Sequence, residues 1–164
     1  MMRLVYLIIV SIILSSCHSD EKVGYVDINL IFNDFEYKKQ LENELTSIKE
    51  KRIAVLDSLE LELKLLYAKL GDRKDSSIIG EFERSKSRFL SLKESYERKT
   101  SEDTDRFDKL IVKQLNQYVK EFGEVEKYKI IYGTSGNGNI MYADSTLNIT
   151  HAVTAFINQK YKGN

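Results

Sequence analysis

Two long stretches of the chain repeat their apolar residues at the spacing of an α-helix. Residues 78–125 carry one such stripe, and between residues 31 and 70 nine apolar positions lie within about 60° of one direction at about 100° per residue: Leu41, Leu45, Ile48, Val55, Leu56, Leu59, Leu63, Leu66 and Leu70. So narrow a stripe is typical of a helix that packs against a single partner helix. The positions expected to face the partner include Leu45, Ile48, Leu59, Leu63, Leu66, Phe82, Phe89 and Tyr96. Because the composition near residues 71–80 is that of a turn, the pattern predicts an antiparallel helical hairpin over residues 31–125.

A polar interruption is expected in the middle of this hairpin. Arg52 occupies a position where a leucine would continue the apolar repeat, and residues 97–106 contain no apolar side chain. When the two arms are folded about residue 75, Arg52 comes opposite residues 96–100. We therefore predict a polar layer, which either weakens packing enough for the arm to bend or only fixes the register of the two helices.

Shorter elements flank the hairpin on both sides. Residues 23–28 are rich in β-branched and aromatic residues, which predicts a strand. Residues 128–142 contain two short apolar runs joined through Asn137-Gly138, a pair typical of a β-hairpin turn. Residues 148–161 have the spacing of an amphipathic helix. The prediction is a mainly α fold, with one domain over residues 23–164 in which a long helical hairpin (a coiled-coil arm) projects from a small sheet.

The first 16 residues have the composition of a signal peptide. Arg3 precedes an apolar run over residues 4–14, which is too short to cross a bilayer core of about 30 Å as a helix. The sequence Leu14-Ser15-Ser16-Cys17 resembles a bacterial lipobox, which implies cleavage before Cys17 and acylation of that cysteine. Residues 17–22 are then expected to tether the domain to its lipid.

Composition limits the possible partners. The 164 residues include no proline, and acidic and basic residues balance at 25 each. The absence of the strongest helix breaker favours long helices. Nucleic acid is not an expected partner, because lysine and arginine are interleaved with acids rather than gathered in the basic stripe that phosphate binding needs.

Residues with catalytic or ligating chemistry do not form a recognisable motif. Gly133, Gly136 and Gly138 lack the Lys-Ser/Thr end of a phosphate-binding loop. His18 and His151 lie in separate regions, without acidic residues at ligand spacing. The sequence therefore predicts a protein that is not an enzyme and that binds no metal and no cofactor.

Leu61 and Leu65 are expected to form an exposed apolar pair. They lie four residues apart on the side of the first arm opposite the seam, where a single hairpin would leave them in water. Two interpretations stay open: the pair contacts a client protein, or it contacts a neighbouring subunit.

Short strings at both ends of the mature chain resemble the OmpH/Skp family of periplasmic chaperones. The strings are Val23 to Ile28, Leu41-Glu42-Asn43-Glu44-Leu45, and Tyr142-Ala143-Asp144 followed by Asn148-Ile149-Thr150. The resemblance implies a homotrimer whose strands build a central body and whose three helical arms enclose a cavity. It also implies that the cavity holds unfolded outer-membrane β-barrel proteins without ATP.

The sequence departs from that family in two ways that shape the functional hypothesis. The chain is neutral overall, whereas soluble members are basic, so capture by charge is not expected. A lipid anchor would place the protein in the periplasm at a membrane. The residue after the cysteine is His18 rather than the aspartate that goes with inner-membrane retention, which favours the outer membrane. The alternative hypothesis is a lipid-anchored coiled-coil spacer or adaptor that binds a folded envelope partner.

Overall fold

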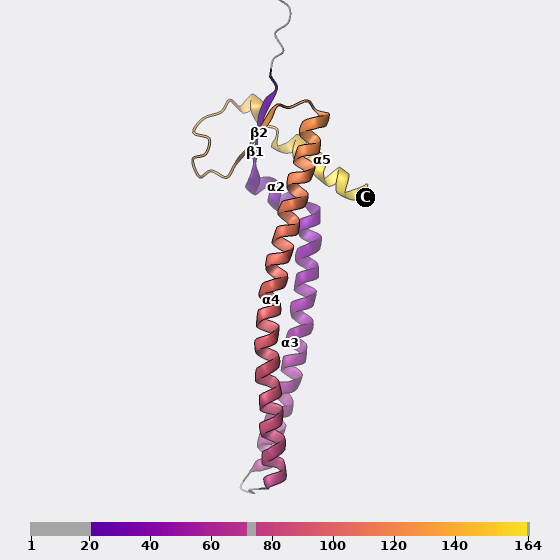
Figure 1. Ribbon diagram of the computed structural model, residues 1–164, viewed down its shortest axis with the longest axis vertical. Coiled ribbons are helices and arrows are strands. Elements are labelled where there is room, and N and C mark those ends of the chain that lie inside the picture. Colours follow the sequence, from indigo (N-terminus) through magenta and orange to yellow (C-terminus); the bar gives the residue numbers. More distant parts are fainter. Residues whose placement is uncertain (1–20, 72–74, 164) are drawn as a thin grey trace, which may run out of the picture.

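The computed structural model describes residues 21–71 and 75–163, and two antiparallel helices dominate it (Figure 1). In chain order the elements are β1 (Val23–Asp27), α2 (Ile28–Asp34), α3 (Glu36–Leu70), α4 (Ser76–Val125), β2 (Ile130–Thr134), the 3-10 helix η1 (Ser145–Leu147) and α5 (Thr150–Lys162). Helices α3 and α4 form an arm that projects from a base, which holds both strands, α2 and α5. The expected fold class, a long helical hairpin on a small sheet, is confirmed.

The arm is built from the 35 residues of α3 and the 50 residues of α4, so that α4 alone is about 75 Å long. At the tip, α3 ends at Gly71, whose φ of 39° is a conformation that glycine adopts without strain. The Asp75 side chain accepts a hydrogen bond from the N–H of Ser77 and caps α4. The second arm helix therefore begins within the segment where the turn was expected.

The first arm helix begins at Glu36, later than its apolar periodicity predicted, because a break at Phe35 separates it from the short α2. The Asp27 carboxylate accepts hydrogen bonds from the N–H groups of Asn29 and Leu30, at 2.9 and 3.1 Å, and starts α2 directly after β1. Phe35 has extended backbone angles, and its side chain is completely buried. Burial of this ring ties the break to the core of the base.

The sheet consists of β1 and β2 in parallel, with Val23 opposite Ile130 at the start of the register. One face of β1 turns inward, since Gly24 and Val26 are buried and alternate with half-buried residues. A Cβ atom at Gly24 would lie 2.7 Å from Cδ1 of Ile149. Glycine therefore allows the segment before α5 to pack closely on the strand.

A continuous cluster of buried apolar side chains joins the base to the part of the arm nearest to it. Its members are Val26, Ile31, Phe35, Leu41, Phe107, Ile111, Leu115, Tyr118, Phe122, Val153 and Ile157. On α4 the cluster extends no closer to the tip than Phe107. Leu59 and Leu66 are also buried, but they lie nearer the tip and do not belong to this cluster.

The β-hairpin predicted over residues 128–142 is wrong. Residues 139–142 form no strand, so Asn137-Gly138 lies in an irregular loop instead of a hairpin turn. After β2 pairs with β1, the chain crosses to the other edge of β1, where Asn148 bridges to Tyr25. Because of this crossing, the loop leaves the free edge of β2. The apolar residues of the loop, 140–143, therefore pair with no strand in the described part of the chain.

The predicted signal peptide (residues 1–16) and Cys17 lie outside the described residues, as does most of the tether at 17–22. The described chain enters β1 at the end of the base farthest from the arm tip (Figure 1). None of the helices in residues 21–71 and 75–163 combines the length and apolar character needed to cross a membrane.

Candidate functional site

The residues predicted for the arm seam are shielded from solvent to different degrees. Leu59 and Leu66 are 6% and 4% exposed. The other six are half-buried: Leu45, Ile48, Leu63, Phe82, Phe89 and Tyr96. Partial burial is what two helices provide when no third helix covers their groove. The arm therefore holds its shape with a thin apolar seam rather than a full core.

A polar layer crosses the middle of the arm, at the position expected from the sequence. The guanidinium of Arg52 donates to Oγ1 of Thr100 at 2.8 Å and to Oδ2 of Asp103 at 2.6 Å. Arg106 binds the other carboxylate oxygen of Asp103 at 3.0 Å, and the Arg52 guanidinium lies 5.9 Å from the ring centre of Tyr96. The side chains of Arg52 and Asp103 are 17% and 18% exposed, so this charge-assisted contact forms largely out of water.

An apolar strip runs along the outer side of α3, opposite the seam. Leu61 and Leu65 are 57% and 56% exposed and lie one helical turn apart. At about 100° per residue, Ala54 and Ala68 fall within about 40° of Leu61 on the helix circumference. Both alanines are also exposed. These four residues are called the outer strip; sequence reasoning identified the leucines and missed the alanines, although their spacing was a usable signal.

Charged residues border the outer strip. Lys64 and Glu60 form an ion pair of 2.6 Å, and both side chains are at least half exposed. The hydrogen bond that Lys64 donates, together with its charge, holds the pKa of Glu60 below its ordinary value. The strip is thus an apolar surface edged by ionised groups, which suits weak contact with an extended apolar segment more than tight docking of a folded one.

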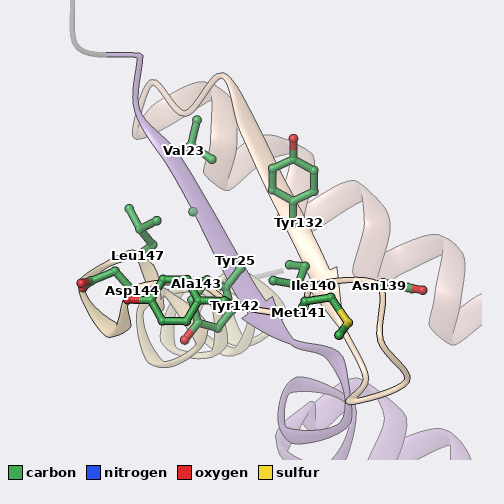
Figure 2. Close-up of a pocket in the computed structure, with 11 residues that line it drawn as sticks. Val23, Tyr25, Tyr132, Asn139, Ile140, Met141, Tyr142, Ala143, Asp144 and Leu147 are labelled. Carbon is green, nitrogen blue, oxygen red and sulfur yellow. The ribbon is translucent and has the colours of Figure 1, made fainter.

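A second candidate surface is a groove in the base, between the outward face of the sheet and the loop after β2 (Figure 2). Its volume is about 720 Å³. Val23 and Tyr25 of β1 and Tyr132 of β2 line one side, while residues 139–144 and Leu147 line the other. We call this surface the base groove.

Several large apolar side chains around the base groove are exposed to solvent. Met141 and Tyr142 are 92% and 84% exposed, and Tyr132 is 48% exposed. Large apolar side chains gathered at a groove are typical of a surface that another chain covers. Sequence reasoning placed Met141 and Tyr142 in a strand and did not identify the groove. One signal could have identified them: residues 140–143 are consecutive apolar residues, whereas a half-buried strand would alternate apolar and polar positions.

The remaining residues that the sequence singled out do not form a site. His151 is exposed on α5, and residues 21–71 and 75–163 contain no group of His, Cys, Asp and Glu side chains arranged to hold a metal. Asn137 and Gly138 are exposed, and the φ values of 77° at Gly136 and 86° at Gly138 serve to turn the loop. Cys17, the predicted lipidation residue, lies outside the described residues.

Comparison with known proteins gives a consistent result. The family model OmpH, described as outer membrane protein (OmpH-like), matches residues 22–157. A crystal structure from Caulobacter crescentus CB15, described as an OmpH-like outer membrane chaperone, superposes with a TM-score of 0.60 and 16% sequence identity, covering 85% of each chain. No curated protein matches the sequence. At this identity the structural likeness shows a shared fold.

Proposed function

Since the chain belongs to the OmpH-like family of outer membrane proteins, we propose that it is a holdase chaperone that binds unfolded outer-membrane proteins without ATP. The observation that carries this proposal is the outer strip. Leu61 and Leu65 are more than half exposed on a long arm, and no described residue of the chain covers them. An extended apolar segment of a client can lie along such a strip.

The physical basis of holding is many weak contacts made at once. A client wrapped by several arms gains affinity from multivalency, although each contact to a strip is small. A disordered client also adapts its shape to the arms as it binds. Because the whole chain is formally neutral, these contacts are expected to be mainly apolar. The client leaves when folding in the membrane gives it a more stable state, and no nucleotide is required.

The proposal includes a homotrimer assembled through the base. A sheet of two strands is too small to be stable without further cover, and β2 keeps a free edge. The base groove places Tyr132, Met141 and Tyr142 in solvent in the single chain. A second copy seated against the groove would bury these side chains, and three copies would set the arms around a common cavity.

The proposal also places the protein at a membrane. Acylation of Cys17 would attach it to the periplasmic side, and the His18 that follows favours the outer membrane. A tethered holdase would not ferry clients freely through the periplasm. It would hold them beside the bilayer to which it is attached.

Aggregation of a client tests the holdase function directly. The mature chain with Cys17→Ser, added below the client concentration, should keep a urea-diluted outer-membrane β-barrel protein from scattering light with no nucleotide present. A folded protein of similar size serves as the control and should give no protection. Failure to protect several different clients would reject the holdase function and favour the alternative, a coiled-coil spacer that binds a folded envelope partner.

A further inference from the structure

A further hollow surface of the base lies between α4 and the sheet, on the face opposite the base groove. Two adjoining hollows, with volumes of about 360 and 350 Å³, share Asn116, Val119 and Ile131 as lining residues, so they form one continuous depression. Ile131 alternates with Tyr132 of the base groove along β2, which places the two surfaces on opposite faces of the strand. We call this depression the side groove, and it runs from the turn between α4 and β2 to α2.

The two ends of the side groove differ in chemistry. Apart from Asn116 and Gly133, every residue that lines the hollow near α2 is apolar. The hollow near the turn is bordered by three exposed charged residues, Lys120, Glu124 and Lys129. A charged mouth and an apolar interior suit a ligand that has a polar head and an alkyl chain.

The mouth of the side groove lies beside the point where the described chain begins. The carbonyl oxygen of Lys22 accepts a hydrogen bond from the N–H of Lys129 at 2.8 Å. The ammonium group of Lys22 donates to the carbonyl oxygen of Glu126 at 2.9 Å and lies 4.1 Å from the ring centre of Tyr128. Tyr128 and Lys129 both line the groove. Since Cys17 precedes Lys22 by five residues, its backbone starts no more than about 17 Å from this mouth.

We propose that the side groove holds an acyl chain carried by Cys17 when the protein is away from a membrane. The lining residues on α4 extend from Val112 to Glu124, a length of about 18 Å. One leaflet of a bilayer core of about 30 Å holds its acyl chains within about 15 Å, so the groove is long enough for one chain. Every methylene group that the groove covers is removed from water. The inference rests on the proposed acylation of Cys17, and it lets the protein carry its own lipid through water until it meets a bilayer.

Fluorescence quenching by a brominated alkyl chain tests where the lipid lies. Cys17 is the sole cysteine and the chain has no tryptophan, so a thiol-reactive reagent attaches the alkyl chain at one point and Val112→Trp provides one reporter. In the mature chain, this reporter should lose most of its fluorescence with the brominated chain and keep it with an unbrominated chain of equal length. Tyr132→Trp, in the base groove and similarly exposed, is the matched control and should keep its fluorescence. Absence of quenching at Val112→Trp, or stronger quenching at Tyr132→Trp, would overturn the proposal.

Binding to phosphatidylcholine vesicles gives a second measurement, because the groove and the bilayer compete for the same alkyl chain. Asn116→Phe puts a ring at an exposed position that lines both hollows. With the alkyl chain on Cys17, this variant should bind vesicles about tenfold more tightly than the mature chain, which corresponds to about two methylene groups that the groove no longer covers. Asn43→Phe, on the exposed surface of α3, is the matched control and should bind like the mature chain.

Equal vesicle affinities of the alkylated Asn116→Phe variant and the alkylated mature chain would also overturn the proposal. Because the alkyl chain is attached chemically, neither experiment depends on acylation in the cell or on client binding. A failure here would therefore leave the holdase function and the lipid anchor standing, and each of those has its own test.

Discussion

The side-chain amide of Asn158 on α5 holds the backbone at the start of the arm, accepting a hydrogen bond from the N–H of Glu36 at 3.0 Å. The same amide donates to the carbonyl oxygen of Asp34 at 3.0 Å, so it spans both sides of the break at Phe35. Two helix ends that would otherwise lack partners are satisfied by one side chain. Helix α5 thereby sets the direction in which α3 leaves the base.

Asn158→Ala should lower the free energy of unfolding by about 1–3 kcal/mol, because it removes partners from two backbone groups. Asn158→Asp keeps the acceptor for Glu36 and loses the donor to Asp34, so its loss should be smaller. Urea unfolding followed by circular dichroism at fixed protein concentration measures both. Asn43→Ala, at an exposed position on α3, is the matched control. A loss in the control as large as that in Asn158→Ala would contradict the bridging role.

Removal of the outer strip should separate client capture from arm stability. Leu61→Ser with Leu65→Ser should lose much of the protection against client aggregation while keeping the helical signal. The same changes at Leu59 and Leu63 should destabilise the arm, since a buried leucine contributes about 1.5–3 kcal/mol. Light scattering and circular dichroism on the two double variants give the comparison. Full protection by the Leu61/Leu65 variant would show that clients bind elsewhere.

Charges in the base groove should prevent assembly. Tyr132→Glu with Met141→Glu would place two carboxylates in the proposed contact between copies, which would have to lose water when the copies meet. Sedimentation equilibrium at micromolar concentration should give a trimer for the mature Cys17→Ser chain and a monomer when the two groove substitutions are added to it. Tyr67→Glu, on the exposed surface of the arm, should leave the trimer intact. A trimer of unchanged stability in the groove variant would remove the base groove from the interface.

The lipid anchor predicts a defined mass for the native protein. Mass spectrometry should find a chain that begins at Cys17 and carries acyl groups, and Cys17→Ser should accumulate as unprocessed precursor. A mature protein with a free thiol at this position would exclude the anchor. The holdase and trimer experiments would be unaffected, because they use protein without lipid.

Acid should weaken the contact between α4 and α5 at Glu121. Its pKa is held below the ordinary value, first by the hydrogen bond from Gln117 at 2.9 Å and then by Lys160 of α5 at 3.2 Å. A carboxylate whose pKa is lowered by folding stabilises the fold at pH values above its ordinary pKa. This contribution is lost as the pH falls through the lowered pKa. In a carboxyl NMR titration, Gln117→Ala should raise the pKa of Glu121 more than Lys160→Met does. Unchanged values in both variants would contradict the assignment.

The arm was predictable from sequence because its contacts follow from helical phase and the centre of the turn. Arg52 illustrates this, since counting from the tip placed it opposite the residues near Thr100 that it contacts. The base was harder because its elements depend on distant partners. The break before Glu36 is stabilised by Asn158, 122 residues away. The loop around Met141 carries a strong local hairpin signal, yet the chain must cross to the far edge of β1, which the local sequence does not encode.

The chain enters β1 at the end of the base opposite the arm tip, and this arrangement gives an anchored molecule a direction (Figure 1). Residues 18–22 separate Cys17 from β1, and fully extended they reach only about 17 Å. With an acyl group on Cys17, the base would stand on the bilayer, and the tips would extend about 75 Å away from it, the length of α4. The open ends of the arms would then face chains arriving from the opposite membrane. Such a protein would stay at one membrane and bind clients after they have crossed the periplasm.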